Sequence, residues 1–415
     1  MIYSTSFFRV TDGVIGGIFL LIILILFGMI TWGDNMKKII PLLLTIVLVF
    51  SFLTGCQQNI IMTSPFSERQ QNEDPPTEQV YQKYSYTFLD TFDTVTQVVG
   101  YTETEEEFNG YAEKIHERML ELHKLYDKYN DYDGINNIKT INDNAGVKPV
   151  KVDRDIIDLI LFSKKMYEDV AGSQTNIAMG SVLEIWHTYR DRAEADPADA
   201  KIPPMEDLLA ASEHTDLNKV IVDVENSTVY LNDPLMSLDV GAVAKGYATE
   251  VVVQEIMEEG FTSGIISAGG NIRAFGKPMD GTRDKWGVGI QNPDSVIGNS
   301  EESIVETVFL TDASVVTSGD YQRFYMVGDK VIHHLIDPET LMPGDYFRAV
   351  TIITQDSGKA DFLSTTVFLL PYDEGKSLVE SLDGVEALWI FKDGTIKTTD
   401  GMKAIMKSEG ATAEN

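Results

Sequence analysis

The sequence has a single cysteine, Cys56, among 415 residues. One cysteine excludes an intramolecular disulfide and any zinc site built from several cysteines. A cysteine nucleophile would have to be Cys56 itself. That residue directly follows a long apolar run, which favours attachment to a membrane over catalysis.

Basic residues are also scarce. The chain has 33 Lys and Arg against 64 Asp and Glu, which gives a formal net charge of −31. Such an acidic surface repels phosphate backbones, so we expect no nucleic-acid partner. Hydrophobic residues make up 43% of the chain and charged residues 23%, which is typical of a globular protein. The length allows one large domain or two ordinary ones.

Two apolar runs open the chain. Residues 13–32 carry no charge and are long enough to span a bilayer. Residues 36–55 begin with Met-Lys-Lys, continue as an apolar stretch and end in Leu-Thr-Gly before Cys56, an order typical of a secretory signal. The ending resembles a bacterial lipobox, in which the cysteine thiol receives diacylglycerol. We therefore predict a lipid anchor at Cys56, on the extracytoplasmic face of the cell membrane. The alternative is a plain transmembrane helix with an incidental cysteine.

Residues 1–35 need a separate explanation, because a signal peptide normally begins the chain. Met36 is a natural start, so we interpret residues 1–35 as an over-extended gene start. The alternative is an additional membrane span. Residues 56–80 are polar and contain three prolines, which predicts a tether between the membrane and a globular body.

The rest of the chain mixes strand and helix patterns without regular alternation, which predicts an α+β class and one domain over residues 81–410. A strand pattern covers 84–101. Capping residues at Thr104 and Asp153 each begin a helix, and a further helix runs from Gly241 to Glu259. The remaining expected elements are a hairpin over 219–231, strands at 265–267, 286–290, 304–310, 314–317, 323–327 and 349–354, a charged surface excursion at 191–206, and a last strong helix over about 359–370.

Two segments have features of a phosphate or ring-binding site. Asp239 directly precedes a helix start made of small residues, where exposed N–H groups favour an anion, and Lys245 lies within reach of a phosphate. Gly269 and Gly270 follow an apolar strand and allow positive φ, so that a flat ring can lie on the backbone before the polar Asn271. The alternatives are an ordinary capped helix with a surface lysine, and a tight turn.

Two more segments carry candidate catalytic and metal-binding groups. His333 and His334 point to opposite faces if the chain is extended, so only one of them needs to face a site. Asp361 and Thr365 are four residues apart on the expected helix, so both oxygens lie on one helical face. Two hard oxygens, a phosphate and waters suit Mg²⁺. The alternatives are a structurally satisfied histidine, and an Asp favoured by the helix dipole beside an inward-packed Thr.

The combination and order of these segments resembles the ApbE family, the FAD:protein FMN transferases. The resemblance runs from about Thr87 to Ala404 and implies a T-fold-like α+β core, FAD as substrate and Mg²⁺ as cofactor. A family of membrane-anchored flavin transferases also agrees with the lipobox. The residues that carry the resemblance are LDVGAVAKGYA (238–248), ISAGGNIRAFG (266–276), WGVGIQNP (286–293), VVTSGDYQRFY (315–325), HHLIDPETLMPG (333–344) and ADFLSTTVF (360–368).

The resemblance also implies site residues. His334 and Asp337, from the H-x-x-D-P segment, are implied at the reacting phosphate. The carbonyl of Ala242 and the side chains of Asp361 and Thr365 are implied as Mg²⁺ ligands. Contacts with FAD are implied for Phe92, Tyr129, Gln174, Thr175, Asn176, Asp239, Lys245, Gly269, Gly270, Asn271 and Leu335.

The sequence departs from the family pattern at three of these segments. Asn176 replaces a carboxylate, which puts the charge of that contact in doubt. Phe92 stands where the family commonly has a Met. Leu341 replaces the glycine of a tight turn after Asp337-Pro338.

The resemblance implies Mg²⁺-dependent transfer of FMN from FAD to a Thr or Ser hydroxyl of an exported acceptor protein, through a phosphodiester bond and with release of AMP. Two alternatives remain, a pyrophosphatase that yields FMN and AMP, and a lipoprotein that binds FAD without catalysis. The chain itself lacks a flavin-acceptor motif of the D-x-x-[ST]-G-A-[ST] kind. It is therefore interpreted as the enzyme and not as the acceptor.

Overall fold

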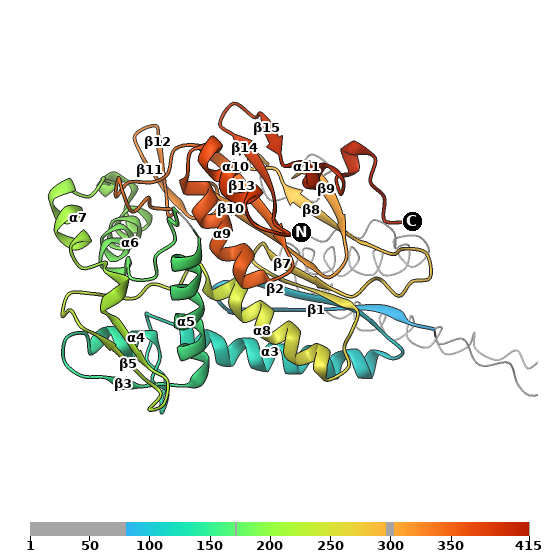
Figure 1. Ribbon diagram of the computed structural model, residues 1–415, viewed down its shortest axis with the longest axis horizontal. Helices are drawn as coiled ribbons and strands as arrows, with labels where there is room; N and C mark the ends of the chain where they lie inside the picture. The colour runs from blue at the N-terminus through green and yellow to red at the C-terminus, as the bar shows by residue number, and fades with distance from the viewer. Residues whose placement is uncertain (1–79, 171, 296–302, 415) are drawn as a thin grey trace, which may run out of the picture. The chain divides into compact units, whose positions relative to one another are not determined.

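An eight-stranded sheet runs through the described part of the chain (Figure 1). The computed structural model describes residues 80–170, 172–295 and 303–414. The strand order is β1-β2-β6-β7-β10-β13-β14-β15, and every neighbouring pair is antiparallel. The strands are β1 Gln82–Thr91, β2 Thr94–Thr102, β6 Gly264–Ala268, β7 Asn271–Phe275, β10 Ala313–Gly319, β13 Phe347–Thr354, β14 Glu386–Phe391 and β15 Ile396–Thr398.

Both faces of this sheet are buried. Successive side chains point to opposite faces of a strand, so Val315 packs with the hairpin of β8 (Trp286–Gln291) and β9 (Ile304–Leu310). Its neighbour Val316 packs on the other face in the main core. The main helices of that core are α3 Glu105–Tyr126, α5 Arg154–Asp169, α8 Ala244–Glu258, α9 Ser357–Leu369 and α10 Tyr372–Glu380, and the short helix α4 (Ile138–Asp143) also contributes.

Helix α9 is buried on all sides, since every residue but Lys359 is buried. A helix that is surrounded in this way belongs to the core. It carries Asp361 and Thr365, whose polar groups are therefore held in fixed surroundings.

A smaller layer packs around Trp186 and supports one wall of the site. Helix α6 (Gly180–Ala195) and helix α7 (Met205–Ser212) share this cluster with the hairpin of β11 (Phe324–Val327) and β12 (Lys330–His333). The remaining elements are β3 Val150–Lys151, β4 Val220–Asp223, β5 Thr228–Leu231, α11 Asp400–Lys403 and the 3₁₀ turns Pro197–Asp199, Leu217–Lys219 and Lys407–Glu409.

The α+β class is confirmed, as are several local predictions. Thr104 caps α3 by accepting a hydrogen bond from the Glu107 N–H at 3.2 Å. Asp153 caps α5 by accepting one from the Asp155 N–H at 3.0 Å. The predicted hairpin around residues 219–231 is present as β4 and β5.

One local prediction is wrong, and two others are incomplete. The single strand over 84–101 is a hairpin of β1 and β2, turned at Phe92 and Asp93 with φ values of 52° and 51°. Neither residue is a glycine, so the sequence contained no glycine that would have indicated a turn inside the strand pattern. The excursion at 191–206 is mostly exposed, as predicted, but it also contains the end of α6 and the start of α7. The strong helix predicted at about 359–370 is present as α9, and the predictions did not include α10 and α11 after it.

The predicted segments 1–35 and 36–55, the anchor at Cys56 and nearly all of the predicted tether lie outside the described residues, and they stay predictions. In the part that the structure describes, no helix has the length and apolar character needed to cross a bilayer.

Candidate active site

A cleft of about 1610 Å³ opens beside the buried helix α9. It is bounded by the β1–β2 turn, the start of α8, the β6–β7 turn, α6 and the β11–β12 hairpin. Most of the residues implied by the family resemblance line it, although Gly270 and Asp337 do not. Those that line it are Phe92, Tyr129, Gln174, Thr175, Asn176, Asp239, Ala242, Lys245, Gly269, Asn271, His334, Leu335, Asp361 and Thr365.

Helices α8 and α9 meet at Gly246, in the wall of the cleft. The Gly246 N–H donates a 2.8 Å hydrogen bond to Oδ2 of Asp361. A Cβ at Gly246 would lie 2.3 Å from the Ser357 carbonyl oxygen and 2.4 Å from the Asp361 Cβ, so only glycine allows this contact. Burial raises the pKa of Asp361, although Lys245, the Gly246 N–H and the Asn271 amide oppose this shift. A cation bound at this carboxyl would favour its charged form.

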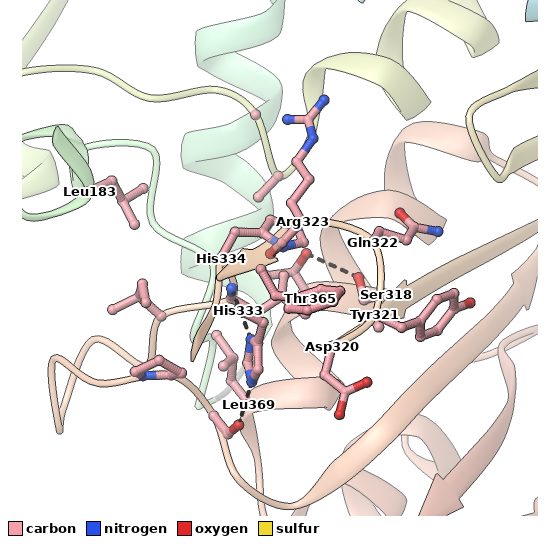
Figure 2. Close-up of a pocket in the computed structure, with 18 of the residues that line it drawn as sticks. Leu183, Ser318, Asp320, Tyr321, Gln322, Arg323, His333, His334, Thr365 and Leu369 are labelled. Carbon is pink, nitrogen blue, oxygen red and sulfur yellow. Dashed lines mark hydrogen bonds between the residues drawn. The ribbon is translucent and has the colours of Figure 1, made fainter. Parts of the chain in front are cut away.

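Oxygen atoms gather around Asp361. Thr365 lies one helical turn further along α9, and its Oγ1 is 3.4 Å from the Ser318 Oγ of β10 (Figure 2). The Ser318 Oγ in turn lies 2.8 Å from the Ser364 Oγ. These are hard oxygen ligands of the kind that Mg²⁺ prefers, so the residues fit this ion.

Carboxylates are few at this position. Among the described residues no three His, Cys, Asp or Glu side chains lie close enough together to bind a metal. Mg²⁺ often binds through one or two carboxylates and completes its shell with phosphate oxygens and water. The single carboxylate of Asp361 is therefore compatible with a site that a phosphate-bearing substrate completes.

The two adjacent histidines differ in their hydrogen bonds. His333 is buried, its Nδ1 accepts from the Leu335 N–H at 3.2 Å, and its Nε2 therefore donates to the Gly344 carbonyl at 2.8 Å. Nδ1 of His334 lies 3.2 Å from the carbonyl oxygen of Arg323, so it carries the proton, and no bond to Nε2 is found among the described residues. Both rings border the cleft, so the predicted alternation of faces does not separate them. What distinguishes the two histidines is Nε2, which is bound to the Gly344 carbonyl in His333 and has no hydrogen-bond partner among the described residues in His334.

The charges around His334 keep it neutral. Burial lowers the pKa of His334 to about 3, and Arg323, His333 and Lys245 add to this shift. A neutral imidazole with a free lone pair can accept a hydrogen bond or a proton from a hydroxyl group.

Asp239 lies in a cluster that the sequence did not predict. Its Oδ2 is 3.0 Å from Nζ of Lys128 and 4.0 Å from Nε2 of His187. Burial would raise the pKa of Asp239, but Lys128 and His187 outweigh it and hold the pKa below its usual value. The hydroxyl of Tyr129 lies 3.2 Å from Nδ1 of the same histidine. Burial, with Lys128 and Arg190 close by, lowers the pKa of His187 to about 4, so this wall presents an ion pair and a neutral imidazole.

The two adjacent glycines of the β6–β7 turn have the positive φ values that the sequence analysis expected. Gly269 and Gly270 have φ values of 57° and 98°. A Cβ at Gly269 would lie 2.1 Å from Oγ1 of Thr94, so the β6–β7 turn packs directly on the β1–β2 turn. Phe92, in that second turn, donates its N–H to Nδ1 of His123 at 3.2 Å. The two turns together form one end of the cleft.

Asp337 and Leu341 shape the turn that follows the histidines. Oδ1 of Asp337 accepts from the N–H groups of Glu339 and Thr340 at 2.7 and 3.3 Å. The structure thus gives Asp337 a role in the turn, and its catalytic role stays a prediction. Leu341 adopts a φ of 59° in place of the family's glycine, with its side chain buried and its carbonyl bound to Nε1 of Trp186 at 3.1 Å.

Asn176 is bound on both sides of its amide. Its Oδ1 accepts from the Ala178 N–H at 2.8 Å, and its Nδ2 donates to the Thr215 carbonyl at 2.9 Å. A carboxylate has no proton to donate to that carbonyl. The departure from the family pattern therefore matches the local surroundings.

The cleft-lining residues that were not assigned from the sequence include Lys128, His187, Ser318 and Arg323. Ser318 and Arg323 belong to the segment 315–325, which carries the family resemblance, so a signal was present for both. Lys128 lies just beyond the apolar stripe of α3, and His187 lies on a helix that was not predicted. For these two, no local pattern gave a signal.

Comparison with known proteins identifies the family. The ApbE family model matches residues 92–389. The FAD:protein FMN transferase of Treponema pallidum (strain Nichols) is 32% identical over 277 residues, which cover 64% of this chain and 73% of that protein. The FAD:protein FMN transferase of Klebsiella pneumoniae (strain 342) is 28% identical over 292 residues, which cover 69% and 85%.

Solved structures agree with this fold. The ApbE protein of Thermotoga maritima superimposes with a TM-score of 0.68 at 25% identity, over 78% of this chain and 99% of that one. The flavin transferase ApbE of Vibrio cholerae does so with a TM-score of 0.63 over 79% and 100%, and at 18% identity it supports the fold alone. Since the family model spans more than half of the sequence, the chain belongs to the ApbE family.

Proposed function

We propose that the protein is an FAD:protein FMN transferase that moves FMN from FAD to a Thr or Ser hydroxyl of an acceptor protein. The curated relatives carry this name. The observation that carries the proposal is that Lys245, His334 and Asp361 all line one cleft. A cation that shares a cleft with a candidate metal ligand and a neutral imidazole suits phosphoryl transfer, which depends mainly on positioning and charge stabilisation.

The reaction breaks one phosphoester bond and forms another. The acceptor hydroxyl oxygen attacks the FMN-side phosphorus of FAD, and the bond from this phosphorus to the bridging oxygen breaks. The bridging oxygen leaves with AMP. The acceptor keeps FMN in a phosphodiester bond, and its hydroxyl proton passes to Nε2 of His334.

The residues of the cleft have separate tasks in this scheme. The Arg323 carbonyl fixes the His334 ring through Nδ1. The negative pyrophosphate of bound FAD raises the pKa of His334 from its low value and makes it a stronger base. The ammonium of Lys245 stabilises charge on the phosphate oxygens. The Ala242 carbonyl, Asp361 and Thr365 would hold Mg²⁺, which when bound neutralises charge on the pyrophosphate.

We also propose that the enzyme is attached to the membrane through Cys56 and acts on exported acceptors with a D-x-x-[ST]-G-A-[ST] motif. The signal-like order of residues 36–56 supports this. Mass spectrometry of the mature N-terminus tests it. A diacylated Cys56 is the expected result, and an unmodified Cys56 or a retained Met1 contradicts the anchor.

The activity is tested with FAD, Mg²⁺ and an acceptor protein that carries the motif. Covalent FMN on the acceptor together with AMP in solution is the expected result. Free FMN with AMP would identify a pyrophosphatase instead, and unchanged FAD would identify a binding protein. An acceptor variant with the motif Thr changed to Ala is the matched control and should remain unmodified.

A further inference from the structure

Arg323 stands apart from the other arginines that the structure describes. Neither an ion pair nor an aromatic ring contacts its guanidinium within residues 80–170, 172–295 and 303–414. The other described arginines all have such partners, namely Arg118, Arg154, Arg190, Arg192, Arg273, Arg283 and Arg348. In a chain with a net charge of −31, an unpaired arginine that borders a cleft is available to an anionic ligand.

The backbone of Arg323 is held in place on both sides. It ends the turn of residues 320–323 between β10 and β11. At the start of this turn the Asp320 carboxylate pairs with Arg348 at 2.9 Å, and the Asp320 N–H donates to the Arg348 carbonyl at 3.0 Å. At its end the Arg323 carbonyl accepts from the His334 N–H at 3.1 Å. The guanidinium therefore extends from a fixed point, as a preorganised binding group requires.

The side chain of Arg323 lies next to the proposed reaction centre. Figure 2 shows Arg323 beside His334, with the arginine side chain extending away from the buried His333. Arg323 and Lys245 both act electrostatically on His334, but of these two only Lys245 acts on Asp361. Both cations line the cleft that His334 borders.

FAD carries two adjacent phosphates. Lys245 and the proposed metal site together suit one of these phosphates, which leaves the other for a second cation. We propose that the Arg323 guanidinium binds an oxygen of the FAD pyrophosphate and thereby selects ligands with a diphosphate. The inference rests on the proposed function, since it takes FAD as the ligand of this cleft. The planar fork of an arginine matches phosphate oxygens with two parallel hydrogen bonds. The carbonyl of the same residue orients His334, so one residue would align the base with the phosphate group.

Lys330 provides a matched control. It borders the same cleft, lies on the same hairpin segment, is exposed, and has no ion pair among the described residues. Lys330→Gln removes the same unit of charge as Arg323→Gln. Any difference between these variants therefore reports a specific contact and not the general field of the cleft.

The test measures the dissociation constants of FAD, ADP and adenosine for the wild type and for Arg323→Gln, Arg323→Lys and Lys330→Gln. ADP serves as a probe that carries a diphosphate without flavin, and adenosine as the same probe without phosphate. A hydrogen bond to a charged group corresponds to about 10- to 100-fold in affinity. We expect Arg323→Gln to weaken FAD and ADP by about that factor, with adenosine unchanged. Arg323→Lys should recover part of the loss, and Lys330→Gln should change affinity less than about threefold.

Three results would overturn the inference. They are equal losses in Arg323→Gln and Lys330→Gln, an equal loss for adenosine and ADP, and a melting temperature of Arg323→Gln well below that of Lys330→Gln. The last result would mean that the guanidinium has a structural partner. A wild-type protein that binds ADP but transfers no FMN to the acceptor would contradict the proposed function alone, so the two failures can be told apart.

Discussion

The backbone N–H of Gly246 donates a 2.8 Å hydrogen bond to Oδ2 of Asp361 across the contact between α8 and α9. This bond joins the helix that carries Lys245 to the helix that carries the candidate metal ligands. Two segments more than a hundred residues apart in the sequence are thereby fixed at one side of the cleft. The close approach depends on the absence of a side chain at residue 246.

Gly246→Ala should destabilise the protein and impair transfer. Alanine favours a helix by about 1 kcal/mol over glycine, but overpacking costs about 1–3 kcal/mol. The new methyl group would lie 2.3 Å from the Ser357 carbonyl oxygen. This oxygen belongs to the backbone of α9, so it cannot move aside as a flexible side chain could. We expect a net loss of about 1–2 kcal/mol in the free energy of unfolding, measured with urea. Gly110→Ala in α3 is the control, because a Cβ there meets nothing within 4 Å and should leave stability equal or higher.

Asp361→Asn should abolish the response to Mg²⁺ while the protein still folds. Asparagine keeps an oxygen for the Gly246 N–H but loses the negative charge that a hard cation needs. We expect FMN transfer to be lost, and Mg²⁺ to raise the melting temperature of the wild type but not of the variant. Wild-type transfer that is insensitive to EDTA would contradict any metal role.

His334→Ala and His333→Ala should fail in different ways. Loss of a general base lowers a rate by about 10²–10⁴-fold, so His334→Ala should slow transfer in that range with FAD still bound. His333→Ala leaves the Leu335 N–H and the Gly344 carbonyl without partners. Since each buried unpaired group costs about 1–3 kcal/mol, this variant should lose about 2–5 kcal/mol of stability. AMP release at saturating FAD, together with urea unfolding, distinguishes the two. Equal loss of rate without loss of stability would refute the assignment.

Acid should destabilise the protein partly through His187. Its pKa is about 4 in the folded state against a usual 6.5, so between these values the unfolded chain binds a proton that the folded chain does not. Stability is therefore complete above pH 6.5 and falls as the pH drops toward 4, by about 3 kcal/mol at most. His187→Gln cannot bind that proton, so its stability should change less with pH over this range. Parallel curves for the variant and the wild type would exclude the effect.

The sequence predicted those features that depend on local chemistry. The caps at Thr104 and Asp153 and the helical pairing of Asp361 with Thr365 all involve residues at most four positions apart. The partners of Asp239 could not be predicted in this way. Lys128 and His187 are 111 and 52 residues away from it, and the packing of separate helices brings them together.

The turn at Phe92 and Asp93 escaped prediction for a different reason. Turns with positive φ are recognised in a sequence by glycine or asparagine, and here a phenylalanine and an aspartate adopt this conformation. Tertiary contacts make up for the strain, because the Phe92 N–H bonds to His123 and its ring lies 5.5 Å from the histidine ring.

Leu341→Gly tests which of two opposing effects dominates in the turn after Asp337. Glycine would relieve the left-handed backbone, which costs a leucine about 1–2 kcal/mol. The same change removes a buried side chain from the cluster around Trp186, where truncation of a leucine costs about 2–5 kcal/mol. Packing should dominate, so we expect a net loss of about 1–3 kcal/mol by urea unfolding. Ser227→Gly is the control, because Ser227 has a φ of 52° at the partly exposed β4–β5 turn and its glycine variant should gain up to about 1 kcal/mol. A stabilised Leu341→Gly variant would mean that the leucine is retained in spite of its strain for a reason other than stability.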